Sequence, residues 1–288
     1  MVVGGDSNCG SRDIERPGGD TERESGAANR GLGGALEAVL KRDRMVVLAA
    51  LFGLVVLSWA YLFYLASQMG GMNQEMVLPR VETWSFVDVL ALYVMWSVMM
   101  VAMMVPSAAP LVLLFANVNR KRQERADPLI STGLFLLGYL LVWVGFSVAA
   151  TLMQWGLHTA ALISPMMVSA SPVLGGLLLI AAGLFQWTPI KQACLRYCRS
   201  PLGFLTVEWR EGRGRALFMG LKHGALCVGC CWALMVLLFV AGVMNLFWIA
   251  AIAAFVLIEK LAPRGAPIGL ATGAVLMVAG VALLVSSL

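Results

Sequence analysis

Long apolar runs recur along this sequence and constrain its fold more than any other feature. A helix that crosses a lipid bilayer needs about 20 consecutive, mostly apolar residues. The sequence therefore predicts an all-α, polytopic transmembrane helical bundle with about seven spans. The seven qualifying stretches are roughly 45–66, 86–117, 130–154, 172–189, 216–242, 245–261 and 267–286. Two prolines, Pro106 and Pro110, predict a kink in the second stretch.

The composition excludes two broad classes of protein. Hydrophobic residues make up 60% of the chain and charged residues only 13%, whereas a soluble domain has about 45–50% and about 25%. A soluble globular enzyme is therefore excluded. The net charge is +5, but a nucleic-acid binder needs its basic residues clustered on a polar surface. Little polar surface is available here, so no nucleic-acid partner is expected.

The first 44 residues differ from the rest of the chain. They are rich in Gly, Arg, Asp, Glu and Ser, and such a segment buries too little apolar area to offset its chain entropy. We expect residues 1–44 to form a disordered cytoplasmic tail and residues 45–288 to form the transmembrane helical domain. The first apolar run begins only at Met45 and is too long and too late for a signal peptide.

The basic residues predict the orientation of the spans. Under the seven-span interpretation, 20 of the 21 Lys and Arg residues fall on one side, and Arg80 falls on the other. Loops on the cytoplasmic side of a membrane carry an excess of Lys and Arg. The sequence therefore predicts a multi-pass protein of the cytoplasmic membrane, with its N-terminus in the cytoplasm and its C-terminus outside.

Cysteines form the first group of residues with chemical potential. Five of them lie between the end of the fourth run and the first half of the fifth. On the predicted topology this is the cytoplasmic side, where a reducing environment disfavours structural disulfides. Grouped thiols there favour metal binding or redox chemistry. The five are Cys194, Cys198, Cys227, Cys230 and Cys231.

Their spacing places them on two helix faces. Cys194 and Cys198 are four residues apart, as are His223, Cys227 and Cys231, and residues four apart share one face of a helix. Cys230 lies near the same face. Thiol redox work and plain packing remain alternatives to metal ligation, because free cysteine is also a small core hydrophobe. For His223 both a ligand role and a non-ligand role stay open.

Methionines form the second group. Met95, Met99 and Met103 share one helix face at steps of four within the second run. Thioethers are soft ligands that suit Cu(I), but methionine is also a flexible filler of apolar cores. Packing is the simpler reading of these three alone, and the cysteines nearby make a copper path more credible.

The charged residues and the search for catalytic motifs give weaker indications of function. Glu259 is expected in a structural ion pair with Lys260 or Lys191 rather than as a ligand. Lys191 and Arg196 are expected to offset thiolate charge near the cysteines. The sequence has no nucleotide-binding glycine loop, no His-Glu-x-x-His and no Gly-x-Ser-x-Gly, so enzymatic activity is left open, with a non-enzyme favoured.

Several strings resemble one bacterial family. They include Met99-Met-Val-Ala-Met-Met-Val-Pro106, Pro189-Ile-Lys-Gln-Ala-Cys-Leu-Arg-Tyr-Cys198, Cys227-Val-Gly-Cys-Cys-Trp232, Gly242-Val-Met-Asn245 and Glu259-Lys260. The chain is similar, over about residues 45–286, to the predicted metal-binding integral membrane proteins, a domain of unknown function. The resemblance implies a helical membrane fold and metal binding, and says little about substrate or reaction.

Together these observations predict a membrane protein that holds a thiophilic metal ion, Cu(I) first and Zn(II) second, in metal handling or delivery. The expected partners are the lipid bilayer and a metal-donor or acceptor protein. The alternatives are a membrane thiol-disulfide oxidoreductase using Cys227 and Cys230, and a non-catalytic membrane scaffold subunit.

Overall fold

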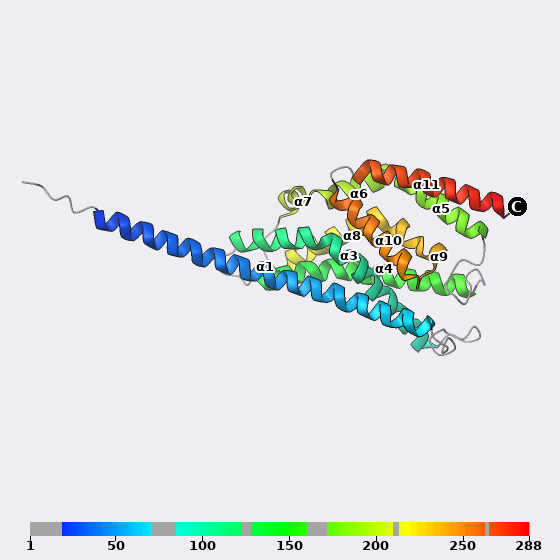
Figure 1. The fold of residues 1–288 in the computed structure, drawn as a ribbon, viewed down its shortest axis with the longest axis horizontal. Coiled ribbons are helices and arrows are strands. Elements are labelled where there is room, and N and C mark those ends of the chain that lie inside the picture. The colour runs from blue at the N-terminus through cyan, green and yellow to red at the C-terminus, as the bar shows by residue number, and fades with distance from the viewer. Residues whose placement is uncertain are drawn as a thin grey trace, which may run out of the picture. The chain divides into compact units, whose positions relative to one another are not determined.

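The computed structural model describes residues 19–70, 85–122, 128–159, 172–209, 213–262 and 265–287. Within these residues the chain is helical and contains no strand, which confirms the all-α prediction (Figure 1). The helices are α1 (Gly19–Gly70), α3 (Phe86–Arg122), α4 (Pro128–Thr159), α5 (Pro172–Gln186), α6 (Pro189–Arg199), α7 (Pro201–Glu208), α8 (Arg213–Val236), α9 (Leu238–Ala241), α10 (Leu246–Leu261) and α11 (Gly265–Ser286).

The number of membrane-sized helices is smaller than predicted. Among the described residues, five helical segments are long and apolar enough to cross a membrane, and a bent pair raises the number to six at most. The seven-span prediction is therefore not confirmed. The five segments are Arg44–Gln68, Phe86–Arg120, Leu129–Thr159, Gly214–Ala241 and Pro267–Ser286. The predicted sixth span is α10, which has only 16 residues.

The predicted fourth span ends earlier than expected because the chain bends there. Helix α5 stops at Gln186, and α6 leaves at an angle of 63°. Thr188 caps the new helix, since its hydroxyl accepts a hydrogen bond from the backbone N–H of Lys191, and Pro189 occupies the first turn. A capping threonine followed by proline is typical of a helix start. Because of this bend, Cys194 and Cys198 lie on a separate short helix, α6.

The second span is longer than predicted. Helix α3 runs without interruption from Phe86 to Arg122 and contains both Pro106 and Pro110. Proline lacks a backbone donor, so each one removes a hydrogen bond from the helix interior.

The N-terminal segment differs from the composition-based expectation. Helix α1 begins at Gly19, so residues 19–44 are helical where disorder was predicted, and residues 1–18 lie outside the described residues. By contacts the chain divides into two units, Met1–Asp43 and Arg44–Leu288. The assignment of the first unit as a cytoplasmic tail stays a prediction.

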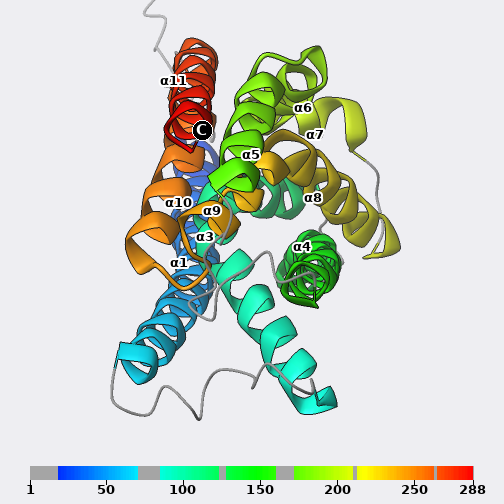
Figure 2. The same cartoon turned by 90° about the vertical axis from the view of Figure 1, so that its right-hand side faces the viewer.

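Two close helix pairs frame the second unit. Helix α4 packs along α8, and α5 packs along α11 (Figure 2). A Cβ added at Gly220 of α8 would overlap the carbonyl oxygen of Phe135 in α4, and one added at Gly138 would lie 2.9 Å from the backbone nitrogen of Leu221. Small residues let helix backbones approach this closely. The α4–α8 contact positions Tyr139 of α4 next to the cysteines of α8.

Candidate metal centre

Helices α6 and α8 bring the two cysteine groups together. The Sγ atom of Cys198 in α6 lies 3.9 Å from the Sγ atom of Cys230 in α8. Cys194, one turn earlier in α6, sits over Gly229, where an added Cβ would lie 3.0 Å from its sulfur. Glycine at this position therefore lets the sulfur of Cys194 approach α8. The two groups share one location, as a common site requires.

Cys227 lies at the centre of the cluster. It is fully buried, and the thiols of Cys230 and Cys231 both donate hydrogen bonds to its carbonyl oxygen, at 3.1 and 2.9 Å. These bonds follow from the spacing of three and four residues along α8. All five cysteines of the described residues are free thiols. Cys227, Cys230 and Cys231 are buried, while Cys194 and Cys198 are partly exposed.

Three groups that sequence reasoning did not select contact this centre. Lys260 of α10 donates from Nζ to the Sγ atom of Cys227 at 2.8 Å and to the hydroxyl of Ser107 in α3 at 3.2 Å. The hydroxyl of Tyr139 lies 3.2 Å from the same sulfur. Lys260 was considered only as a partner for Glu259. No sequence pattern pointed to Tyr139 or Ser107, because their approach depends on how four helices pack.

One methionine reaches the cysteines directly. The Sγ atom of Cys231 lies 4.0 Å from the Sδ atom of Met104 in α3. Met95, Met99 and Met103, the three that the sequence analysis selected, are buried in the same apolar core. Their role as ligands stays a prediction. Met104 was not among the methionines selected from the sequence, and the orientation of α3 about its own axis decides that it points to Cys231.

Two sulfur–sulfur separations have the length that a shared metal ion requires, which is also the length of an ordinary van der Waals contact between sulfurs. Metal–sulfur bonds are about 2.3 Å long for zinc, so two sulfurs on a three-coordinate ion of similar bond length lie about 4.0 Å apart. The Cys198–Cys230 and Cys231–Met104 separations are 3.9 and 4.0 Å. Within the described part of the chain, no three His, Cys, Asp or Glu side chains are already arranged as a metal-binding group. Ligation by thiolates alone would therefore need small side-chain movements.

His223 lies one turn before Cys227 and is buried among aromatic rings. Its ring centroid is 5.7 Å from that of Tyr139 and 5.2 Å from that of Phe204 in α7. Its Nδ1 atom is buried and has no hydrogen-bond partner among the described residues. The ring could rotate or ligate from this position, and its role as an auxiliary ligand stays a prediction.

The predicted charge partners are arranged differently. Lys191 pairs with Glu259, with Nζ and Oε1 2.6 Å apart and both side chains buried, and it also donates to Oε1 of Gln186. The expectation that Glu259 forms an ion pair is met by Lys191. The expectation that Lys191 faces the thiols is wrong, because its ammonium is engaged by Glu259. Lys260, and not Lys191, contacts a thiol of the cluster, that of Cys227.

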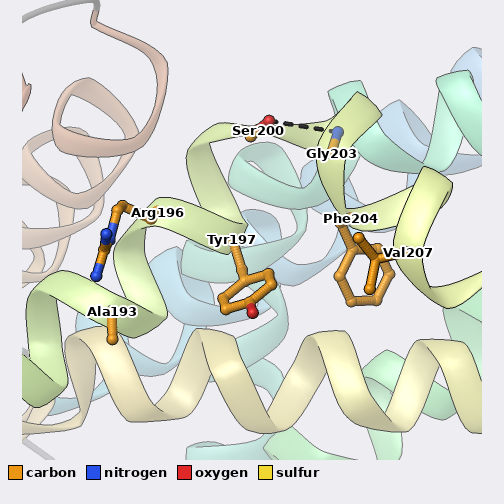
Figure 3. A pocket seen from close by; sticks show the side chains of 7 residues that line it. All are labelled: Ala193, Arg196, Tyr197, Ser200, Gly203, Phe204 and Val207. Atoms are coloured by element: carbon orange, nitrogen blue, oxygen red, sulfur yellow. Dashed lines mark hydrogen bonds between the residues drawn. The ribbon is translucent and has the colours of Figure 1, made fainter.

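A pocket of about 460 Å³ lies between α6 and α7. Arg196 and Tyr197 line it from α6, and Gly203 and Phe204 line it from α7 (Figure 3). Arg196 is exposed and lines this pocket, and its expected role beside the thiols stays a prediction. Because Phe204 also contacts His223, the pocket leads toward the aromatic side of the cluster.

The fold and this site define a class: an all-helical protein with a buried group of soft sulfur donors. A family model described as "PpoB2: Copper chaperone" matches residues 93–283. The chain belongs to this family. The match covers the cysteine cluster, Met104 and Lys260, and it supports the expected relation to metals, copper in particular. No curated protein and no solved structure matches the chain.

Proposed function

We propose that this protein is a multi-pass membrane protein that binds Cu(I) through its cysteine cluster and delivers it to an acceptor protein. The observation that carries the proposal is that the partly exposed Cys198 meets the buried Cys230 and Cys227 within a chain of a copper chaperone family. Thiolates and thioethers are the ligands that Cu(I) prefers. Copper is here the cargo that the protein holds and passes on.

Membrane insertion is supported by the outer surfaces of the helices. Large apolar side chains project outward there, with exposed fractions of 71% for Phe52 and 70% for Val278. In water such surfaces would drive association, whereas in lipid they are the favoured exterior. The absence of strands among the described residues fits as well, because a helix satisfies its own backbone in hydrocarbon. We place the protein in the cytoplasmic membrane.

A donor and an acceptor for copper would reach the cluster through its partly exposed members. Cys194 and Cys198 are half-buried, whereas the α8 cysteines and Met104 are fully buried. Copper would therefore pass first to α6 and then to α8. Zn(II) is the second candidate metal, because a cluster of thiolates also binds zinc.

The test is metal retention by purified protein. Full-length protein in detergent, kept reduced, is loaded with Cu(I) and dialysed against a competing Cu(I) chelator, and bound copper and zinc are measured by elemental analysis. We expect wild type to keep copper and the triple variant Cys227→Ser, Cys230→Ser, Cys231→Ser to lose it. Serine is similar in size but its oxygen is a poor ligand for soft metals. Full retention by the triple variant would place the ligands elsewhere, and no retention by wild type would contradict the proposal.

A further inference from the structure

Lys260 occupies an unusual position for a lysine. Its side chain is buried and contacts α3 and α8, with its Nζ atom 2.8 Å from the Sγ atom of Cys227 and 3.2 Å from the hydroxyl of Ser107. The neighbouring carboxylate, Glu259, pairs instead with Lys191 at 2.6 Å. The positive charge of Lys260 is therefore directed at the thiols.

A buried ammonium is costly unless an opposite charge compensates it. Cys227 is the closest acidic group that contacts it, and Cys198, Cys230 and Cys231 also interact with the same charge. The phenol of Tyr139, which contacts Cys227, and the hydroxyl of Ser107 are neutral neighbours, and the imidazole of His223 also interacts with the charge of Lys260. The lysine is thus a fixed positive charge built into the cluster.

This fixed positive charge affects whether the site favours a monovalent or a divalent ion. Cys231 lies one turn after Cys227 and donates to its carbonyl oxygen, and the thioether of Met104 next to Cys231 is neutral. Lys260 repels any metal ion held beside Cys227, and by Coulomb's law it repels a divalent ion about twice as strongly as a monovalent ion at the same place. This difference does not depend on how many thiolates ligate the ion. The fixed positive charge therefore favours the monovalent ion.

We propose that Lys260 sets the selectivity of the site for monovalent over divalent soft metal ions. The inference rests on the proposed function and deepens it, because it explains how a sulfur cluster discriminates between Cu(I) and Zn(II), which both bind thiolates. Lys260 acts through the charge of the site and ligates no metal. Ser107 positions the ammonium, since its hydroxyl is the second acceptor of Lys260.

The experiment compares affinities for Ag(I), a monovalent probe without redox chemistry, and Cd(II), a thiophilic divalent probe. Both are titrated into full-length reduced protein in detergent, against chelators of known affinity. We expect Lys260→Met to lower the ratio of Ag(I) to Cd(II) affinity by at least about tenfold relative to wild type. Lys260→Arg keeps the positive charge and should stay within about threefold of wild type.

Two further variants make the test specific. Lys222→Met removes an exposed positive charge from the same helix as the cysteines, where Lys222 pairs with Glu208, and should leave the ratio unchanged. Ser107→Ala keeps Lys260 but removes its second acceptor, and should lower the ratio by about two- to fivefold. Ser107→Ala carries the test by itself if Lys260→Met does not fold.

The outcomes separate this inference from the proposed function. If wild type retains Cu(I) while the ratio of a folded Lys260→Met variant stays within twofold of wild type, the selectivity role is overturned and copper binding stands. The same conclusion follows if Ser107→Ala is the variant that folds and its ratio does not fall. If wild type binds neither Cu(I) nor Ag(I), the proposed function and this inference are both lost.

Discussion

The sulfur of Cys198 lies 3.9 Å from the sulfur of Cys230, although 32 residues separate them. The contact joins a partly exposed thiol on α6 to a buried thiol on α8. Because α6 follows the bend after α5, the bend places Cys198 at the edge of the cluster. The cluster therefore has an outer end at the partly exposed Cys198 and an inner end where the buried Cys231 contacts Met104.

The outer end predicts a kinetic role for Cys198. Replacing Cys198 with Ser should slow the loading of Cu(I) from a chelator by about tenfold, because the first partly exposed acceptor is lost. Retention at equilibrium should fall less than in Cys227→Ser, which removes the buried central ligand. Stopped-flow loading followed by dialysis measures both quantities. Cys9→Ser, far along the sequence from the cluster, is the control; equal loading rates for it and Cys198→Ser would contradict the role.

The inner end predicts that Met104 matters for copper. Met→Leu preserves volume and apolarity and usually costs less than about 1.5 kcal/mol, so Met104→Leu should fold normally and hold Cu(I) more weakly by about three- to tenfold. Chelator competition measures the change. The triple variant Met95→Leu, Met99→Leu, Met103→Leu tests the sequence-selected stripe in the same assay. If that triple variant binds and moves copper as wild type does, those three residues only pack.

The α4–α8 contact predicts opposite effects for two glycines of α4. Gly138→Ala forces a Cβ against the backbone of Leu217 and Leu221, and overpacking of this kind costs about 1–3 kcal/mol. Gly145→Ala meets no atom within 4 Å, so it should be neutral or stabilising by up to about 1 kcal/mol, given the low helix propensity of glycine. Thermal unfolding in detergent compares the two. A lower melting temperature for Gly145→Ala than for Gly138→Ala would contradict the packing.

Spacing within one helix predicted much of the cysteine site. Cys227, Cys230 and Cys231 belong to one stretch of α8, and the step of three or four residues is enough to place them on one face. The contact of Met104 with Cys231 was not predicted, and the ligand role of Met95, Met99 and Met103 stays a prediction. One residue is about 100° around a helix. Helix α3 is apolar on all sides, so its own sequence does not indicate which face turns toward α8.

Contacts between distant segments were the part that sequence reasoning missed. Lys260 follows Cys227 by 33 residues, and only the packing of α10 against α8 brings them together. The bend at Trp187–Thr188, by contrast, was indicated by a pattern in the sequence. Thr188 followed by Pro189 is a helix start, and reading it would have ended the predicted fourth span at Gln186, as the structure does.

The ion pair of Lys191 and Glu259 predicts a large loss of stability when one partner is removed. Both side chains are buried, with exposed fractions of 0% and 2%. Lys191→Met leaves an uncompensated carboxylate, which costs about 3–5 kcal/mol in buried pairs. Adding Glu259→Gln should recover most of this loss. Both are measured by thermal or denaturant unfolding in detergent.

The chain supplies a matched control for that pair. Lys222 and Glu208 are also 2.6 Å apart, but Lys222 is 43% exposed. Exposed pairs contribute about 0–1 kcal/mol, so Lys222→Met should change stability by less than that. Equal losses for Lys191→Met and Lys222→Met would show that burial does not govern the effect.

The side on which the C-terminus lies depends on whether α10 crosses the membrane. Its 16 residues extend about 24 Å at 1.5 Å per residue, less than the roughly 30 Å of bilayer hydrocarbon. If α10 crosses, the count is seven and the C-terminus lies outside, as the distribution of basic residues predicts. If only the five long helices and the bent pair cross, the count is six and the C-terminus returns to the cytoplasm. We expect seven, because six would place Lys260 and Arg264 on the other side of the membrane from the remaining basic loops.

Reporter domains fused after Ser287 decide between six and seven spans. With seven spans, a reporter enzyme that is active only outside the cytoplasm should be active, and a reporter that fluoresces only in the cytoplasm should be dark. The opposite pair of results would establish the six-span arrangement.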